Sequence, residues 1–315
     1  MRTHVFRRSV GLLVVSVVIV ACVYALLARN GSVKQLPKPR PAEEHRLLSP
    51  ETYTYLLNQP AACKVRKPFL VLMVPVAPHD YSAREAIRKT WGTASQDTLT
   101  LFYMGITEGG QARSTLWEES RTHSDVIQMN FLDTYKNLTI KTMMMMNWLA
   151  THCPDVFYAM KVDADIFVNV FYLVRMLRSS PRRGYITGSV ISHGKPQRNA
   201  ASKWALSEQM YPEDRLPTYV SGAGYVFSID LAAEISRASR FVRLVPYEDV
   251  YVGLCLRVLG IRPVYGRTWL FKNLFEIRNL EYDRCRFAGL VLVNGFQPSQ
   301  LLQAWKDFSQ GYKSC

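Results

Sequence analysis

Two aspartates with a spacing of two, Asp163 and Asp165, follow closely behind an apolar run at residues 156–160. An apolar, β-prone run of this kind predicts a buried strand whose carboxyl end delivers both side chains into a crevice. The pair suits Mg²⁺ or Mn²⁺, which take oxygen ligands from one or two carboxylates and from the phosphates of a substrate. Because an aspartate at a strand end often only caps a turn, the pair alone does not establish a metal site.

A second acidic pair, Glu248 and Asp249, opens a run that is predicted to be a helix. Acidic residues in the first turn of a helix usually stabilise the helix dipole, but a pocket can make one of them a general base. Residues 219–225, which are mostly small, predict a loop between extended segments. The backbone of Gly222 and Gly224 could approach a ligand closely there, although such loops are more often only tight turns.

The elements that would position these side chains alternate between strands and helices. Apolar runs predict strands at residues 69–76, 99–105, 125–129 and 156–160, and the intervening segments predict helices from residue 82 and at 111–123 and 137–152. The first helix would open with a capping box from Ser82 to Glu85, and the methionine-rich last helix is interpreted as core filling. This order predicts an α/β fold with a mostly parallel sheet and helices on both faces, as in nucleotide-binding folds.

Composition limits the possible classes of function. The chain has 315 residues, of which 48% are hydrophobic and 20% charged, so it can bury a sizeable core and is not a disordered protein. Its net charge is +14, and residues 1–50 contribute eight basic and two acidic side chains to that total. The remainder is less basic and has no run of Lys and Arg interleaved with aromatics. We therefore expect an anionic small-molecule substrate rather than a nucleic acid.

The N-terminus has the pattern of a membrane anchor. Residues 1–8 carry three arginines, and residues 9–28 then run without a charge, which is long enough to cross a bilayer. A cleaved signal peptide is the competing interpretation, but the run exceeds a typical signal core and lacks a convincing cleavage site. We expect a cytoplasmic tail at residues 1–8, a transmembrane signal-anchor at 9–28 and the rest of the chain in the lumen.

The segment behind the anchor is rich in proline. Five prolines stand among polar and charged residues at positions 31–60, a composition typical of a semi-rigid extended spacer. We expect a luminal stem at residues 29–62, with a short helix possible at 51–57, and a catalytic domain at 63–315.

Cysteine usage agrees with an oxidising lumen. Five cysteines lie beyond the anchor and allow at most two internal bridges, whose pairing the sequence does not assign. They are Cys63, Cys153, Cys255, Cys285 and Cys315. No Cys-x-x-Cys pair occurs, so a zinc site is not expected. Asn137 and Asn30 stand in glycosylation acceptor motifs, although Asn30 lies close to the membrane and Asn137 could simply cap its helix.

Five motifs, taken together and in this order, resemble those of the Golgi β1,3-galactosyltransferase family. They are residues 84–92 (REAIRKTWG), 133–141 (DTYKNLTIK), 161–169 (KVDADIFVN), 219–225 (YVSGAGY) and 248–255 (EDVYVGLC). The resemblance implies a GT-A fold, UDP-galactose as donor, a Mn²⁺ ion (or Mg²⁺) and inversion at the anomeric carbon. The implied acceptor is a terminal N-acetylhexosamine, GlcNAc or GalNAc, on a glycoprotein or glycolipid at the Golgi membrane.

The resemblance also implies roles for individual residues. Asp249 would be the general base, with Glu248 as the alternative, while Asp165 would bind the metal and Asp163 would lie by the ribose or in the outer shell of the metal. The nucleotide site would further involve Arg84, Arg88, Asp133, Lys141, Gly222 and Gly224.

Two residues depart from the pattern of the family. Val220 stands where relatives often have cysteine, and Asn294 stands where a metal-binding histidine would be. An amide oxygen can still coordinate a hard cation, so Asn294 stays a candidate metal ligand.

Two alternatives remain open. One is a β1,3-N-acetylglucosaminyltransferase, which belongs to the same superfamily. The other is a non-catalytic luminal protein of the same fold that binds glycans or assists folding. The aspartates Asp163, Asp165 and Asp249 favour an enzyme, whereas Asn294 favours the non-catalytic protein.

Overall fold

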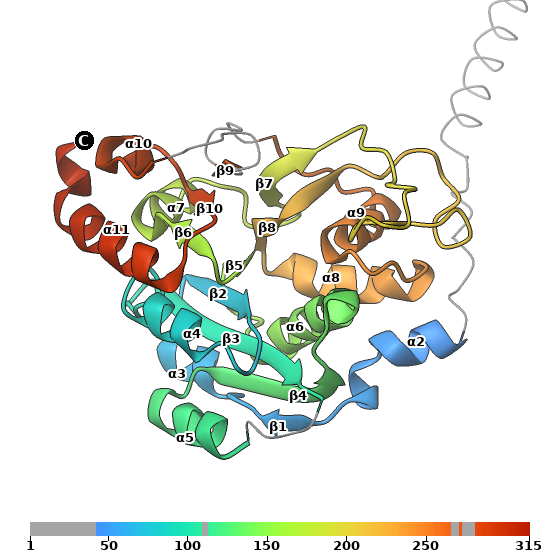
Figure 1. Cartoon of the computed structure of the whole chain (residues 1–315), viewed down its shortest axis with the longest axis horizontal. Coiled ribbons are helices and arrows are strands. Elements are labelled where there is room, and N and C mark those ends of the chain that lie inside the picture. Colours follow the sequence, from blue (N-terminus) through green and yellow to red (C-terminus); the bar gives the residue numbers. More distant parts are fainter. Residues whose placement is uncertain (1–41, 109–112, 266–270, 273–280) are drawn as a thin grey trace, which may run out of the picture. The chain divides into compact units, whose positions relative to one another are not determined.

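The computed structural model describes residues 42–108, 113–265, 271–272 and 281–315 (Figure 1). The predicted tail, the predicted membrane span at 9–28 and residues 29–41 of the predicted stem lie outside these ranges. None of the helices within the ranges is long and apolar enough to cross a bilayer. The described residues belong to one unit that extends from Pro39 to Cys315.

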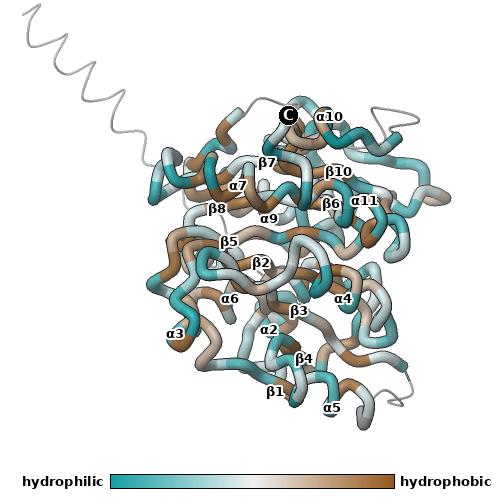
Figure 2. The backbone as a smooth tube through the Cα atoms, turned by 90° about the vertical axis from the view of Figure 1, so that its left-hand side faces the viewer, coloured by the Kyte–Doolittle hydropathy of each residue, from teal (hydrophilic) through white to brown (hydrophobic). Residues whose placement is uncertain are grey.

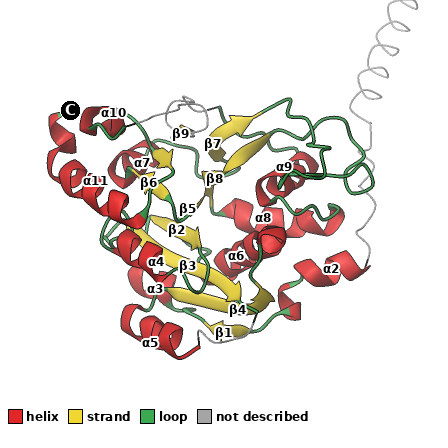
Figure 3. Ribbon diagram, in the orientation of Figure 1, coloured by secondary structure: helices red, strands yellow, loops and turns green. Residues whose placement is uncertain are grey.

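The larger of the two sheets in the described part of the chain has seven strands in the order β1-β4-β3-β2-β5-β8-β7. Its middle is parallel and consists of β2 (Leu70–Pro75), β3 (Thr98–Ile106), β4 (Val126–Leu132) and β5 (Tyr158–Val162). The edges are antiparallel: β1 (Tyr55–Leu57) pairs with β4, while β8 (Tyr219–Ser228) lies between β5 and β7 (Ile186–Ile191). The predicted α/β class is confirmed, with a mixed sheet that is parallel in its centre (Figure 3).

Helices cover both faces of this sheet, because alternate residues of its central strands enter two different cores. Val71 and Met73 of β2 belong to a core shared with α6 (Leu138–His152), α8 (Asp230–Ala238) and α9 (Glu248–Leu259). Leu70 and Leu72 belong to the other core, shared with α4 (Tyr81–Arg88), α7 (Val170–Leu177) and α11 (Pro298–Gly311). Apolar segments accordingly run through the central strands in Figure 2. The consecutive methionines of α6 are buried in the first core, as predicted.

A smaller sheet contains β6 (Ile166–Val168), β10 (Leu292–Asn294) and β9 (Phe271–Lys272). Strand β10 runs antiparallel to β6 and parallel to β9. Asn169 caps α7 by accepting a hydrogen bond from the Tyr172 backbone N–H at 3.0 Å. Its amide also donates to the backbone oxygens of Phe287 and Ala288, both at 3.2 Å, which ties α7 to α10 (Arg284–Ala288). Asn169 thus fixes the end of β6 to both α7 and α10.

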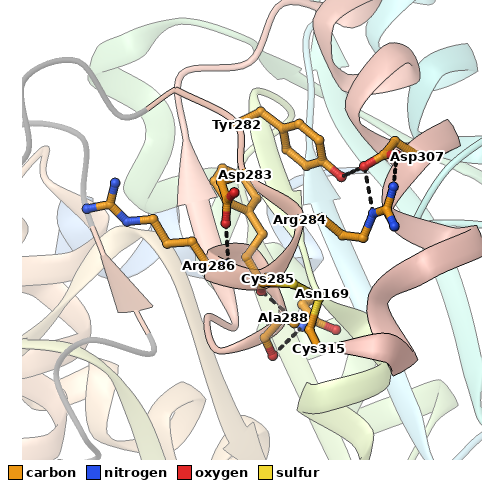
Figure 4. The surroundings of a disulfide bond; sticks show 10 residues. Asn169, Tyr282, Asp283, Arg284, Cys285, Arg286, Ala288, Asp307 and Cys315 are labelled. Carbon is orange, nitrogen blue, oxygen red and sulfur yellow. Dashed lines mark hydrogen bonds and ion pairs between the residues drawn. A yellow bond between two sulfur atoms is a disulfide. The ribbon is translucent and has the colours of Figure 1, made fainter.

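Two disulfides hold the periphery. Cys63 on α3 (Ala62–Arg66) is bonded to Cys153 behind α6, and Cys285 on α10 is bonded to Cys315. Figure 4 shows the second bridge beside an ion pair between Arg284 and Asp307 of α11. Cys255 is buried in α9 and lies outside both bridges, which agrees with the predicted limit of two.

Residues 42–57 differ from the expectation that they form an extended stem. Helix α2 (Ala42–Leu48) buries Leu48, and the Glu44 carboxylate accepts a hydrogen bond from the Leu244 N–H at 2.9 Å. A 3₁₀ turn (Pro50–Thr52) and strand β1 stand where a helix at 51–57 was expected. Tyr53 then packs against Phe131 with ring centroids 5.9 Å apart. Apolar side chains among the prolines therefore fix this segment to the sheet.

Two further expectations differ from the structure. The small residues at 219–225 lie within strand β8 and do not form a loop. They suit a strand there because a Cβ on Gly224 would lie 2.3 Å from the Leu292 side chain, so only glycine lets β10 pack so closely. The capping box is also not formed: α4 begins one residue before Ser82, and its N-cap Asp80 makes no side-chain cap. Helix α5 (Arg113–His123) begins within two residues of the prediction.

Candidate active site

A cavity of about 580 Å³ lies at the carboxyl end of β5. Segments far apart in the sequence line it: the turn after β5, the first half of β8, the start of α9 and the end of β10. From these segments come Asp163, Asp165, Gly222, Glu248, Asp249 and Asn294. Five of the ten residues that we predicted as catalytic, nucleotide-binding or metal-binding thus share this one cavity, together with the alternative base Glu248.

Asp163 and Asp165 are held where β5 ends. The Asp163 N–H donates to the Ala223 oxygen at 3.1 Å, and its carboxylate accepts a hydrogen bond from Lys161 Nζ at 2.6 Å. Burial raises the pKa of Asp165, and the negative charge of Asp163 raises it further. Two negative charges placed close together in this way attract a cation.

Asn294 lies beside Asp165 because β10 pairs with β6. In this pairing Asn294 is opposite Ile166, and the backbone N–H groups of Gly295 and Phe296 both donate to the backbone oxygen of Asp165 at 2.9 Å. Two carboxylates and one amide give oxygen donors that fit a hard divalent cation, provided that a substrate completes the shell. The part of the chain that the structure describes holds no group of three or more His, Cys, Asp or Glu that could hold a metal by itself.

The two acidic residues at the start of α9 have different surroundings. Asp249 is half-buried, and its two carboxylate oxygens accept hydrogen bonds from the Gly222 N–H at 3.0 Å and the Val250 N–H at 2.8 Å. Burial raises the pKa of Asp249, although these two hydrogen bonds act in the opposite direction. Its partial exposure to the cavity leaves it able to meet a substrate hydroxyl.

Glu248 is buried, and its carboxylate lies within the protein. One oxygen, Oε2, accepts a hydrogen bond from the Tyr225 hydroxyl at 2.9 Å. The other, Oε1, lies 3.1 Å from Lys161 Nζ; this contact is an ion pair without hydrogen-bond geometry. Burial raises the pKa of Glu248 to about 7, against the opposing charge of Lys161.

Lys161 is a residue of this site to which sequence reasoning gave no role. Its ammonium is buried between Asp163 and Glu248 and also donates to the backbone oxygen of Gly222, whose N–H holds Asp249. Burial alone would lower the pKa of Lys161, but the two carboxylates raise it. A lysine within an apolar strand is a signal that could have revealed this role, since a buried ammonium requires carboxylate partners.

Arg84 and Arg88, for which nucleotide contacts were expected, do not line the cavity. The Arg84 guanidinium is buried and makes two bonds of 2.7 Å to Glu119, and it donates to two backbone oxygens as well. Arg88 contacts Glu119 at 2.6 Å, Asp125 at 2.8 Å and Glu85 at 3.0 Å. The charges of both arginines are thus paired with carboxylates of the protein.

Asp133, Lys141 and Gly224 are also not among the residues that line the cavity. Lys141 Nζ is buried and contacts the Asp133 carboxylate at 2.8 Å and the Val76 oxygen at 3.0 Å. Gly224 faces Leu292 and Met160 in the core. The contacts of Lys141 join α6 to the segments that follow β2 and β4, and those of Gly224 join β8 to β5 and β10.

Aromatic and basic residues form another part of the cavity wall, and sequence reasoning missed them. Tyr135 and Tyr247 come from segments just before α6 and α9, while Lys195, Lys203 and Trp204 come from the connection between β7 and β8. Nothing in their spacing marks them, because they belong to irregular segments without a periodic pattern. Together with the acidic residues they give a cavity with one carboxylate-rich part and one aromatic part.

Comparison with known proteins gives consistent matches. A family model described as Galactosyltransferase matches residues 82–266. Human beta-1,3-galactosyltransferase 2 is 40% identical over 267 residues, which cover 82% of this chain and 63% of that protein. Mouse beta-1,3-galactosyltransferase 1 is 39% identical over 272 residues, which cover 84% of this chain and 81% of that protein. The chain thus spans less than two thirds of the human relative.

Solved structures of glycosyltransferases are similar at a lower level. The galactosyltransferase LgtC in complex with donor and acceptor sugar analogs has a TM-score of 0.36 and 10% identity, covering 78% of this chain and 95% of that one. The WbbM bifunctional glycosyltransferase has a TM-score of 0.41 and 10% identity, with coverage of 78% and 51%.

Proposed function

The chain belongs to the galactosyltransferase family, and from this premise we propose that it transfers galactose from UDP-galactose to a glycan acceptor. The bond formed is a β1,3 linkage to a terminal N-acetylhexosamine, GlcNAc or GalNAc, on a protein or a lipid. One observation carries the proposal. A single cavity holds the oxygen donors Asp163, Asp165 and Asn294 together with a second, half-buried carboxylate, that of Asp249, which can accept a proton.

Asp249 is the proposed general base. The 3-hydroxyl oxygen of the acceptor forms a bond to C1 of galactose while the bond from C1 to the UDP oxygen breaks, and UDP leaves with the electron pair. Asp249 accepts the hydroxyl proton. Attack from the face opposite UDP inverts the anomeric carbon in one step. Partial burial favours this role, because a carboxylate with a raised pKa is the stronger base.

Glu248 is less suited to that role. Its carboxylate is buried against Lys161, and Tyr225 donates to one of its oxygens. We propose that it supports Lys161, which in turn holds Asp163 and the backbone next to Asp249 in place.

Mn²⁺ or Mg²⁺ would be held by Asp165 and Asn294, with Asp163 in the inner or outer shell. When bound, the ion would supply a Lewis acid that stabilises negative charge on the departing UDP. The donor atoms support this assignment because they are all oxygens, and the diphosphate of the donor adds more.

For the whole chain we propose a single-pass type II protein of the Golgi membrane. Its cytoplasmic tail is at residues 1–8, its anchor at 9–28 and its catalytic domain in the lumen, with a stem that ends before α2. The two disulfides support an oxidising compartment.

Incubation of the full-length protein in detergent with labelled UDP-sugars tests the proposed function. The panel holds UDP-galactose, UDP-GlcNAc and UDP-GalNAc, each with acceptors that end in β-linked GlcNAc or GalNAc. We expect galactose transfer, a β1,3 linkage in the product and loss of transfer with a chelator. Transfer from UDP-GlcNAc alone would support the N-acetylglucosaminyltransferase alternative. Binding of UDP without any transfer would support the non-catalytic one.

A further inference from the structure

Two large aromatic side chains of the cavity wall are exposed. Trp204 is 48% and Tyr135 is 49% exposed, whereas Trp91 and Trp148 in the cores are almost completely buried. An isolated exposed aromatic residue is ordinary, but these two line the same cavity as Asp163 and Asp249. Apolar rings next to polar groups in a cavity are typical of a binding surface.

A lysine connects the two rings. Lys203 Nζ lies 4.5 Å from the ring centroid of Trp204 and 6.0 Å from that of Tyr135. Tyr135, Lys203 and Trp204 line the same cavity as Asp249. The aromatic surface therefore adjoins the proposed base and carries a hydrogen-bond donor at its side.

The segment that carries Trp204 is fixed relative to the base. The Tyr247 hydroxyl lies between two backbone oxygens, at 3.0 Å from that of Lys203 and 2.9 Å from that of Ala205. Tyr247 directly precedes Glu248 and Asp249 in the chain. In addition, the Leu206 N–H donates to the Gln197 oxygen at 2.7 Å. The ring of Trp204 is thus attached to a preorganised segment, and a preorganised surface loses little entropy on binding.

The chemistry of a pyranose matches this surface. One face of such a ring presents C–H bonds, which pack against an aromatic ring, while its hydroxyls point outward to hydrogen-bond donors such as an ammonium. We propose that Trp204 and Tyr135 form the acceptor subsite, on which the terminal pyranose ring of the glycan stacks with its reacting hydroxyl towards Asp249. Lys203 donates to a hydroxyl of the same sugar. This assignment rests on the proposed function, because it names the acceptor side of the same cavity.

The experiment compares three variants of the full-length protein in detergent. In Trp204→Ala we expect the KM for a GlcNAc-terminated acceptor to rise about tenfold, with the KM for UDP-galactose within about twofold of wild type. Trp204→Phe keeps an aromatic face, so its acceptor KM should be close to that of wild type. Trp117→Ala is the matched control, because Trp117 on α5 is 51% exposed and packs with Arg121 outside the cavity. Unchanged UDP binding in Trp204→Ala would show that the variant is folded.

Two outcomes would overturn the subsite. One is an acceptor KM in Trp204→Ala equal to that of wild type; the other is an equal rise in the KM values for donor and acceptor. If wild type transfers no sugar, direct binding of a GlcNAc-terminated oligosaccharide replaces the KM. Binding that Trp204→Ala loses would then support the subsite although the proposed function had failed, whereas no binding by wild type would overturn both.

Discussion

Two clusters of charged side chains in this protein contain similar residue types. They differ in the balance between positive and negative charges. The arginine cluster comprises Arg84, Arg88, Glu85, Glu119 and Asp125, and all three nitrogens of the Arg84 guanidinium make hydrogen bonds. Burial opposes ionisation of Glu119, but the two arginines prevail and lower its pKa. The charges in this cluster satisfy one another.

The cavity cluster comprises Lys161, Asp163, Asp165, Glu248 and Asp249. A single ammonium stands among four carboxylates, and the pKa values of Asp165, Glu248 and Asp249 are all raised, with burial as the largest cause. This cluster has more carboxylates than cationic groups, and it opens into a cavity. The pKa of Glu119 is lowered in the arginine cluster, whereas three carboxylate pKa values are raised in the cavity cluster, and raised values in a cavity are typical of a functional site.

The largest effect should come from breaking the arginine cluster. Arg84→Met leaves Glu119 buried with one arginine fewer, so we expect the free energy of unfolding to fall by about 3 kcal/mol. Arg178→Met is the control, because its ion pair with Asp97 is exposed on both sides and should contribute at most about 1 kcal/mol. Denaturant unfolding measures both. If Arg84→Met kept wild-type stability but lost UDP binding, Arg84 would have a role in nucleotide binding and the structural role would be contradicted.

In the cavity cluster, replacement of the proposed base Asp249 should instead lower the turnover of the enzyme. In Asp249→Asn we expect kcat to fall by about a hundredfold or more, equivalent to about 2.7 kcal/mol, while UDP affinity stays near wild type. Glu248→Gln should cost much less, because its carboxylate faces Lys161 and Tyr225. Initial rates and UDP titrations measure these effects. Near wild-type turnover of Asp249→Asn would exclude it as the base.

The raised pKa of a buried carboxylate in the cavity cluster should also make the stability of the protein depend on pH. The folded pKa of Glu248, about 7, exceeds the unfolded value of 4.5, so the folded state binds more protons between these values. Stability should therefore decrease as pH rises from 5 to 7, by about 2 kcal/mol from this group. Lys161 does not offset this slope, because it stays charged throughout this range. Denaturant unfolding at several pH values should give a flatter profile for Glu248→Gln, and equal slopes would contradict the assignment.

The smallest expected effect concerns the metal side of the cavity. Asn294→His replaces a neutral oxygen donor by the nitrogen that Mn²⁺ accepts well, so the half-saturating Mn²⁺ concentration should fall about tenfold, or roughly 1.4 kcal/mol. Calorimetric titration of Mn²⁺ in the presence of UDP gives the affinity independently of turnover. Asn199→His, on the exposed connection between β7 and β8, is the control. Superimposable titrations of wild type and Asn294→His would place Asn294 outside the metal shell.

Several features could be predicted from sequence because they depend on local pattern. Apolar runs identified β2, β3, β4 and β5, and the strand ending before Asp163 indicated where a ligand would meet the sheet. The number of cysteines limited the bridges to two. These features can be predicted without knowing which distant residues are in contact. The local run of apolar residues is enough to indicate that a strand is buried.

Other features depend on partners that are distant in sequence. Residues 84–92 contain two arginines, for which the family resemblance implied a nucleotide site. The sequence does not reveal that Glu119 and Asp125 pair with them. The glycines of β8 resembled a loop because Leu292, which packs on Gly224, comes much later in the chain. Trp204 lies on an irregular segment whose position is set by the Tyr247 hydroxyl. Such contacts cannot be read from periodicity.

The pairing of β6 with β10 has a consequence for the order in which the chain becomes functional during synthesis. The parallel strands β2 to β5 and the helices that connect them have all been synthesised when residue 162 emerges from the ribosome, and N-terminal parts generally fold first. Asp165 does not gain the Gly295 and Phe296 hydrogen bonds until β10 has been made and has paired with β6. A nascent chain therefore contains the whole parallel centre of its larger sheet well before the proposed metal ligands Asp165 and Asn294 come together.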